Sequence, residues 1–318
     1  MRRLPVLIAV VIAVVASCAA QPHTTIHVPY TIRGAALEGD ALYTWGDGLR
    51  RWVLPALRAA VLARGRFADG GCLLDFNGDG RIDVILQDGA PVGRLLWFEA
   101  PHWTRHVIDR EIEMHDCLAA ELFGRRGFLM IHRYSQVRFY QPGGVRDIYS
   151  IYTPSRQGGL ALADVDADGR LDILCGNYWI RSPERFELPW RLFAINTISE
   201  QPDSALFRLA WNGMLVVSQG EMKPGRAVRF RKPGDPREQW PAIVLADGLA
   251  YPHGLLLRRD EIVVAENNGR RSRWFVFAPG GERRVESRGI PAHTMCIWGD
   301  SIVTAGPRNV TIWFAAYL

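Results

Sequence analysis

Two short acidic segments carry side-chain oxygens at a spacing that suits a calcium ion. Calcium takes several oxygen ligands at about 2.3 to 2.6 Å that converge on one point. Alternate positions of a tight loop point their side chains inward, so each segment predicts one structural calcium site. The predicted ligands occupy positions 1, 3, 5 and 9 of each segment: Asp75, Asn77, Asp79 and Asp83 in the first, and Asp164, Asp166, Asp168 and Asp172 in the second.

The remaining positions of both segments fit the same reading. Gly80 and Gly169 stand at position 6, where the loop must turn sharply. Arg81 and Arg170 stand at position 7, where only the backbone carbonyl is expected to bind the ion. We therefore include both arginines among the predicted metal ligands.

These segments are not EF-hands. An EF-hand needs a bidentate Glu at position 12, and here the twelfth residues are Leu86 and Cys175. The flanking residues are also typical of strands, which places each loop in a hairpin. The alternative to calcium is a solvated aspartate-rich turn that caps the hairpin through its own hydrogen bonds.

The strands that would hold these loops belong to a repeat. The two calcium segments, Leu73 to Leu86 and Leu162 to Cys175, lie about 89 residues apart, or two periods of about 44. Elsewhere the segment from Glu38 to Gly46 matches the one from Trp298 to Gly306 around a Gly-Asp turn. Short apolar runs bounded by Gly, Asp and Pro indicate strands throughout. A repeat of this length with about four strands predicts one propeller blade.

Seven such repeats would fill the chain after its N-terminal segment. We therefore predict an all-β, seven-bladed β-propeller of four-stranded antiparallel blades, with six or eight blades as alternatives. The last repeat stops after its third strand, at Thr311 to Phe314, and the segment from Thr25 to Tyr30 has the character of a fourth strand. This N-terminal strand is expected to complete the last blade and close the ring, which leaves no long sheet edge exposed.

The two loops, together with the segment WFEAPHWTRHVI from Trp97 to Ile108, resemble the FG-GAP/VCBS repeat family of calcium-binding β-propellers. That resemblance implies calcium in the two loops and an exported protein. The other repeats are short or uncharged at the ligand positions, so we expect calcium at these two loops alone.

The N-terminus has the features of an export signal. Arg2 and Arg3 precede a nearly pure apolar run from Leu4 to Val15, which is too short to span a bilayer comfortably. The run leads into the sequence Val-Ala-Ser-Cys, which resembles a bacterial lipobox ending at Cys18. Lipidation of Cys18 is therefore predicted, with anchoring by lipid chains and not by a spanning helix. The alternatives are ordinary signal cleavage after Ala20 and an uncleaved signal anchor.

These features define the predicted organisation of the chain. Residues 1–17 would be the signal peptide, residues 18–23 a lipidated tether and residues 24–318 the propeller. The predicted location is the cell envelope, either anchored by lipid or free in the periplasm. Ala19 stands where an Asp would favour retention in the inner membrane, so the outer membrane is favoured.

Four cysteines remain after the lipobox: Cys72, Cys117, Cys175 and Cys296. Their apolar surroundings are typical of small buried side chains with free thiols. A disulfide between neighbouring blades, for example Cys72 with Cys117, is the alternative that export would allow.

The net charge of +5 does not indicate a nucleic-acid-binding protein. Two of the positive charges belong to the signal peptide, and the other basic residues are scattered along the chain without forming a block or stripe. We therefore expect contact with the membrane through lipid only, and a protein or glycan as the ligand.

Three histidines are the candidates for chemistry. His253 and His293 each lie seven residues before the Asp of a hairpin turn, and His115 lies near the corresponding place of its own repeat. In the family that the repeats resemble, such positions start the innermost strands, near the mouth of the central channel. Three histidines there could bind a metal or act as acid and base. The alternative is that they fix hydrogen bonds between blades.

Catalysis is therefore uncertain, and we expect none. No nucleophile with its base and no phosphate-binding loop is found. The sequence favours a calcium-stabilised, non-enzymatic binding module, and the second interpretation is a carbohydrate lyase or dehydratase. An enzyme predicts a channel pocket where the histidines converge with carboxylates, whereas a binding module predicts histidines buried between blades.

Overall fold

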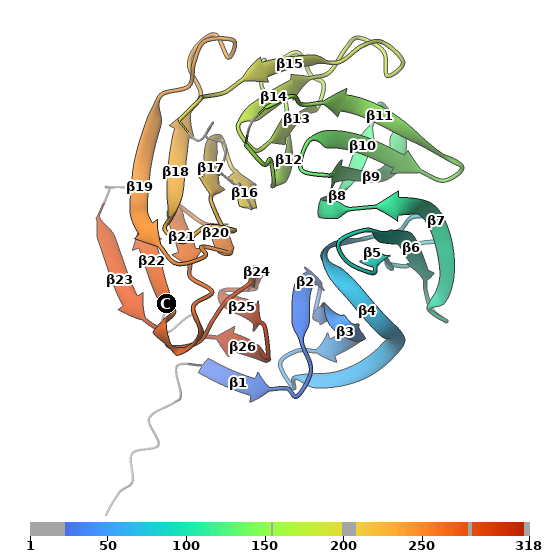
Figure 1. The fold of residues 1–318 in the computed structure, drawn as a ribbon, viewed down its shortest axis with the longest axis vertical. Coiled ribbons are helices and arrows are strands. Elements are labelled where there is room, and N and C mark those ends of the chain that lie inside the picture. The colour runs from blue at the N-terminus through green and yellow to red at the C-terminus, as the bar shows by residue number, and fades with distance from the viewer. Residues whose placement is uncertain (1–22, 154, 199–207, 279–281, 315–318) are drawn as a thin grey trace, which may run out of the picture.

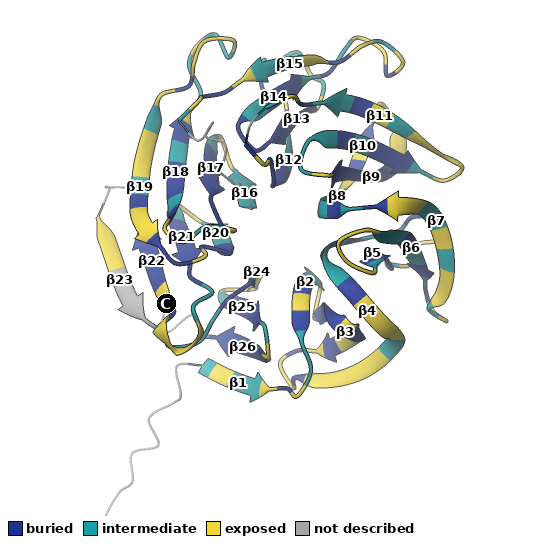
Figure 2. Ribbon diagram, in the orientation of Figure 1, coloured by how far each residue is buried: buried dark blue, intermediate teal, exposed yellow. Residues whose placement is uncertain are grey.

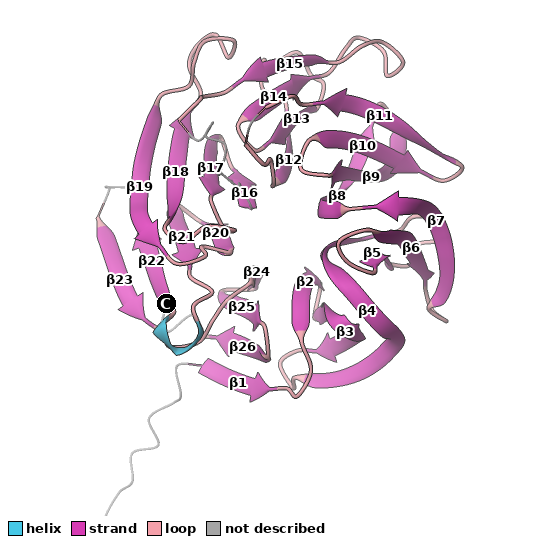
Figure 3. Cartoon of the chain, in the orientation of Figure 1, coloured by secondary structure: helices cyan, strands magenta, loops and turns pink. Residues whose placement is uncertain are grey.

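The computed structural model describes residues 23–153, 155–198, 208–278 and 282–314. Its strands surround a central axis, as Figure 1 shows. The predicted signal peptide and Cys18 lie outside the described residues. Within these ranges the helical turn η1 (Gly269–Arg271) stands among 26 strands (Figure 3). No helix of the described residues is long and apolar enough to cross a membrane.

The strands form six hydrogen-bonded antiparallel sheets, five of four strands and one of six. The six-stranded sheet comprises β2 (Ile32–Glu38), β3 (Ala41–Val53), β4 (Arg58–Leu74), β5 (Asp83–Asp88), β6 (Gly93–Glu99) and β7 (Thr104–Ile112). The next sheet comprises β8 (Met114–Leu122), β9 (Arg125–His132), β10 (Gln136–Gln141) and β11 (Gly144–Ser150). It is followed by β12 (Leu160–Ala163), β13 (Asp172–Cys175), β14 (Tyr178–Arg181) and β15 (Arg191–Ala194).

The remaining three sheets complete the ring. One comprises β16 (Arg208–Trp211), β17 (Met214–Ser218), β18 (Gly225–Arg231) and β19 (Ala242–Leu249). The next comprises β20 (Gly254–Arg258), β21 (Glu261–Ala265), β22 (Arg273–Phe277) and β23 (Arg283–Ser287). The last comprises β24 (Thr294–Trp298), β25 (Ser301–Gly306), β26 (Asn309–Trp313) and β1 (His23–His27).

The predicted number of seven blades is wrong, because the described strands form six sheets. The difference arises in the first two expected repeats, which share the six-stranded sheet. Strand β4 runs without a break from the end of one repeat into the start of the next, and pairs with β3 through one part and with β5 through another. Strand β3 also extends over 13 residues, from Ala41 to Val53, beyond the end of the repeated segment at Gly46.

The N-terminal strand closes the ring. Strand β1 pairs with β26 in antiparallel register, from His23 opposite Trp313 to His27 opposite Asn309. The predicted pairing of the N-terminal segment with the last sheet is therefore confirmed, with a strand that starts and ends slightly earlier than expected. Strand β24 of this sheet also contacts β2, so the first and last sheets meet (Figure 1).

The core lies between neighbouring sheets. Central strands such as β5, β13 and β17 are almost entirely buried and rich in Val, Ile and Leu, whereas about half or more of the residues in outer strands such as β7 and β19 are exposed (Figure 2). One apolar cluster joins β12–β15 to β16–β19 and includes the buried rings of Trp179 and Trp240. Burial of this aliphatic and aromatic surface is what holds adjacent sheets together.

Candidate calcium loops and channel-mouth residues

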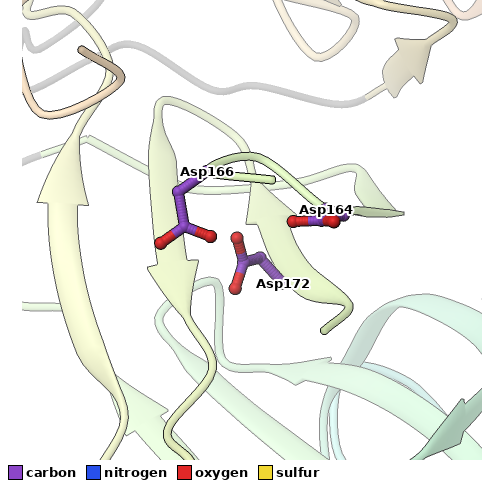
Figure 4. A group of neighbouring side chains, drawn as sticks. All are labelled: Asp164, Asp166 and Asp172. Carbon is purple, nitrogen blue, oxygen red and sulfur yellow. The ribbon is translucent and has the colours of Figure 1, made fainter. Parts of the chain in front are cut away.

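The second acidic loop brings three carboxylates together. The loop joins β12 to β13, with Asp164 directly after β12 and Asp172 as the first residue of β13. Oxygens of Asp164, Asp166 and Asp172 all lie within 4.8 Å of one another (Figure 4). Like charges so close repel each other unless a cation or a hydrogen-bond donor stabilises them.

Backbone amides hold Asp164 in this loop. One carboxylate oxygen of Asp164 accepts a hydrogen bond from the Asp168 amide at 3.0 Å, and the other accepts one from the Gly169 amide at 2.9 Å. Gly169 has φ of +84°, a conformation that a residue with a side chain rarely adopts, which explains the glycine at position 6. The loop therefore closes on its first residue.

Asp172 anchors the loop to the sheet. Its side chain is fully buried and accepts hydrogen bonds from the Val165 amide at 3.2 Å, the Ser182 amide at 2.8 Å and Trp179 Nε1 at 2.8 Å. Burial nevertheless raises the pKa of Asp172 above its usual value. The sequence predicted a role in metal binding for this residue but not its hydrogen bonds to the strand that follows.

Arginine side chains partly neutralise the second loop. Arg181 forms ion pairs with Asp166 and with Asp168, and Arg170 also pairs with Asp168. The Oδ1 atom of Asp166 is buried and accepts no hydrogen bond from the described residues. An unpaired buried carboxylate oxygen beside two further carboxylates is a fitting environment for a divalent cation.

The first loop has a similar backbone geometry. Asp75 accepts hydrogen bonds from the amides of Gly78, Asp79 and Gly80 at 2.8 to 3.0 Å. Asn77 Oδ1 accepts one from the Asp79 amide at 3.1 Å. The loop is also tied to the neighbouring sheet, because Arg126 Nη1 lies 3.0 Å from Asp75 Oδ2.

Asp83, the ninth residue of the first loop, is buried and hydrogen-bonded in the same way as Asp172, the ninth residue of the second loop. Asp83 is fully buried and accepts hydrogen bonds from the amides of Ala100, at 2.8 Å, and Phe76, at 3.2 Å. Burial raises the pKa of Asp83. Among the described residues, the grouping of three acidic side chains occurs at the second loop, since the first has an amide at position 3.

Both loops therefore fit calcium in their oxygen content, and the second fits it better in its geometry. In both, the arginine at position 7 turns its side chain toward the carboxylate at position 5. The sequence did not reveal Arg126 and Arg181 as partners of the loops. Arg126 approaches from the neighbouring sheet, and Arg181 lies 13 to 15 residues from the two aspartates that it contacts.

Two of the three candidate histidines contact each other. The rings of His253, just before β20, and His293, just before β24, meet edge to face with their centres 4.6 Å apart. Both side chains are buried, with relative exposures of 9% and 7%. Burial lowers the pKa of His253 to about 4 and that of His293 well below its usual value, so both are neutral at neutral pH.

His115 has a separate set of neighbours. Its Nε2 atom lies 3.2 Å from Glu113 Oε1, and its ring stacks on Tyr134 with the centres 3.1 Å apart. Burial lowers the pKa of His115 to about 4, although Glu113 opposes that effect. The contacts in the structure thus bring together His253 and His293, and they give His115 different partners.

Other charged groups of this region are also paired. Arg33 on β2 lies 3.3 Å from Asp69 on β4. Arg208 on β16 lies 3.9 Å from Asp116 on β8, and the inner strand β12 contacts both of these strands. Gln157 is fully buried, and its Oε1 atom accepts a hydrogen bond from the Asn177 amide at 3.0 Å. These contacts stabilise neighbouring inner strands against one another.

The cysteines divide into a linked pair and two thiols. Cys72 on β4 and Cys117 on β8 form a disulfide between neighbouring sheets, as the alternative interpretation of the sequence proposed. Cys175 is fully buried and Cys296 is half-buried, and both are free thiols. Burial raises the pKa of Cys296 to about 11 and raises that of Cys175 further.

The chain is similar in structure to known β-propellers. No protein-family model matches it, and no curated protein matches its sequence. YCF48 from Cyanidioschyzon merolae covers 93% of this chain and 99% of its own, with a TM-score of 0.61 and 8% identity. The β-propeller domain of Cps50 (Swd1) from Myceliophteria thermophila covers 91% and 98%, with a TM-score of 0.60 and 12% identity.

A third solved structure extends the comparison to a designed protein. The computationally designed Ika8 protein covers 91% of this chain and 97% of its own, with a TM-score of 0.52 and 11% identity. Likeness at such low identity establishes architecture and not activity. The chain has the fold of a β-propeller.

Proposed function

We propose that this chain is an exported, calcium-stabilised β-propeller that acts as a non-enzymatic binding module for a protein or a glycan. The observation that carries the proposal is the burial of His253 and His293 against each other between neighbouring inner strands. Histidines in this arrangement support packing between sheets, whereas acid and base catalysis requires groups that reach a substrate. His115 does not join them, and its neighbours are Glu113 and Tyr134.

Calcium has a structural role in this proposal. Asp164, Asp166, Asp168 and Asp172 would hold the ion in the second loop, together with the backbone carbonyl of Arg170. The matching ligands of the first loop would be Asp75, Asn77, Asp79, Asp83 and the backbone carbonyl of Arg81. A bound calcium ion would supply positive charge that offsets the repulsion of grouped carboxylates. The support is the cluster of three carboxylates and the buried Asp166 Oδ1 that accepts no hydrogen bond from the described residues.

Export rests on the N-terminal sequence. The charged and apolar segments before Cys18 and the resemblance of its surroundings to a lipobox support lipidation and a place in the cell envelope. Anchoring would occur through lipid alone. The disulfide between Cys72 and Cys117 suits an oxidising compartment. Radiolabelled palmitate incorporated into the wild-type chain, and not into Cys18→Ser, would test lipidation.

Binding is tested with purified mature chain, residues 18–318, against a glycan array and an array of purified envelope proteins, each in calcium and in EDTA. We expect saturable binding that weakens in EDTA. His253→Gln, which removes the imidazole, should leave binding intact if the chain remains folded. Cleavage of a polysaccharide by the wild-type chain, lost in His253→Gln, would contradict the proposal and support the lyase interpretation.

A further inference from the structure

A groove of about 480 Å³ lies on the outer side of the propeller, between β7 and the hairpin of β10 and β11. Its lining includes Phe76, Trp97, Tyr140 and Val145. Pockets for small ligands have volumes of about 300 to 1,000 Å³ and combine apolar walls with a few polar groups. The groove also includes Asn77, so it borders the first acidic loop.

An aromatic wall forms one side of the groove. The rings of Trp97 and His106 stack with their centres 4.4 Å apart and their planes 27° from parallel. The side chain of His106 is 40% exposed, so part of this wall is open to a ligand. A flat aromatic surface suits the apolar face of a sugar ring, which presents C–H groups while its hydroxyls point outward.

Polar groups stand next to the aromatic wall. Glu99 accepts a hydrogen bond from Asn77 Nδ2 at 3.0 Å, and its other oxygen lies 2.8 Å from His106 Nε2. Asp109 Oδ2 accepts a hydrogen bond from the Tyr140 hydroxyl at 2.8 Å. Each carboxylate oxygen has a further lone pair that can accept a hydrogen bond from a sugar hydroxyl.

The charge of this region determines which sugars fit. Glu99 and Asp109 are acidic, and Arg138, which lies 3.9 Å from Asp109, is shared with Asp147 at 3.0 Å. Carboxylates attract hydroxyl donors and repel an acidic sugar. The groove therefore favours a neutral sugar over a uronic acid.

We propose that this groove binds a neutral oligosaccharide, with one sugar ring on the wall of Trp97 and His106 and its hydroxyls donating to Asp109, while Glu99 fixes His106 and Asn77 from behind the lining. This proposal rests on the proposed function, whose ligand it names. Asn77 and Phe76 line the groove and lie in the first acidic loop, so calcium at that loop would order one end of the site.

A second groove provides a matched control. It has a volume of about 470 Å³ and lies between β19 and β22. Its lining is mainly aliphatic and includes Met214, Ile243 and Leu245. Ile243 is 47% exposed and Val145 is 51% exposed, so a substitution at either position costs little stability.

Binding is measured by calorimetry on the full mature chain in calcium, with cellobiose, maltotriose and mannobiose as neutral probes and digalacturonate as the acidic probe. Three variants are compared with the wild type. His106→Ala removes half of the aromatic wall, Val145→Glu places bulk and negative charge in the groove, and Ile243→Glu makes the same change in the control groove. Circular dichroism verifies that each variant is folded.

We expect at least one neutral probe to bind the wild type and Ile243→Glu equally. Its Kd should rise at least about tenfold in His106→Ala and Val145→Glu. If a neutral sugar bound all variants equally, the groove would not be its binding site, whereas the proposed function as a binding module would stand. The absence of neutral-sugar binding, tighter binding of digalacturonate, or a peptide competing for the groove would overturn the saccharide proposal. Only the loss of both glycan and protein binding would overturn the proposed function as well.

Discussion

Replacing Asp172 with Ala should destabilise the propeller whether or not calcium is present. Three donors bond to this buried carboxylate, at 3.2 Å from the Val165 amide and at 2.8 Å from both the Ser182 amide and Trp179 Nε1. Each buried donor without an acceptor costs about 1 to 3 kcal/mol. Because burial disfavours the charged form of Asp172, removing the carboxylate offsets part of this cost. We therefore expect the free energy of unfolding to fall by about 4 kcal/mol.

The assay is urea unfolding in EDTA, followed by tryptophan fluorescence, so that no metal contributes. Asp166→Ala is the matched control, because Asp166 pairs with the partly exposed Arg181 and lacks the three buried donors. In EDTA it should cost at most about 1 kcal/mol. In calcium, however, Asp166→Ala should lose the part of the added stability that the wild type gains at the second loop.

Asp172→Asn provides a second comparison. It keeps one oxygen acceptor and replaces the other with a donor, so its loss should fall between those of Asp172→Ala and the wild type. A loss below about 1 kcal/mol for Asp172→Ala in EDTA would refute the reasoning, because it would mean that the three donors find other partners at no cost.

Three further predictions concern the disulfide, pH and calcium. Cys72→Ser with Cys117→Ser should cost about 4 kcal/mol in urea unfolding, since the bond closes a loop with a sequence separation of 45; a midpoint equal to that of the oxidised wild type would contradict it. Burial lowers the pKa of His253 from 6.5 to about 4, so the unfolded chain binds the proton first and stability should fall as the pH drops from 6.5 to about 4. His253→Gln should remove about 3 kcal/mol of this loss of stability, so the thermal midpoint should depend less steeply on pH in that window. An unchanged slope would count against the burial of a neutral His253. Asp79→Ala with Asp168→Ala should abolish the rise in Tm that calcium produces, as scanning calorimetry would show, and a full rise in this variant would point to other ligands.

Strands and loops could be predicted well from the sequence, because whether a segment forms a strand or a loop depends largely on residues close to it in the chain. Apolar runs bounded by Asp or Gly, such as residues 83–88, indicated strands, and β5 lies there. The Asp-rich segments were placed in hairpins between the first and second strands of a repeat, and Asp164 and Asp172 lie at the ends of β12 and β13. The closing pair of β1 and β26 also followed from the incomplete last repeat.

The number of sheets depends on hydrogen bonds that the repeat does not specify. Asp47 and Gly48 are residue types that are common in turns, yet the chain remains in strand β3 through them. Likewise, β4 extends over 17 residues and joins two expected repeats. Gly and Asp in a sequence mark places where a strand can end, and the pairing of neighbouring strands decides whether it does.

Contacts across sheets were the hardest to anticipate. His253 and His293 occupy matching places in their repeats and do meet, but His115 lies beside Glu113 and Tyr134. The spacing along the chain sets the depth of a residue in its sheet, and the side chains of the neighbouring sheet set its partners. For the same reason the contact of Arg126 with the first acidic loop could not be read from the loop itself.

The most direct measurement is a calorimetric titration of calcium into the chelator-treated mature chain. We expect saturable binding of one ion at each acidic loop, tighter at the loop of residues 164–172, where three carboxylates lie within 4.8 Å. Titration of magnesium should give weaker binding, because it demands a stricter octahedral site. The absence of binding heat at millimolar calcium, with the chain folded, would show that the acidic loops are not calcium sites.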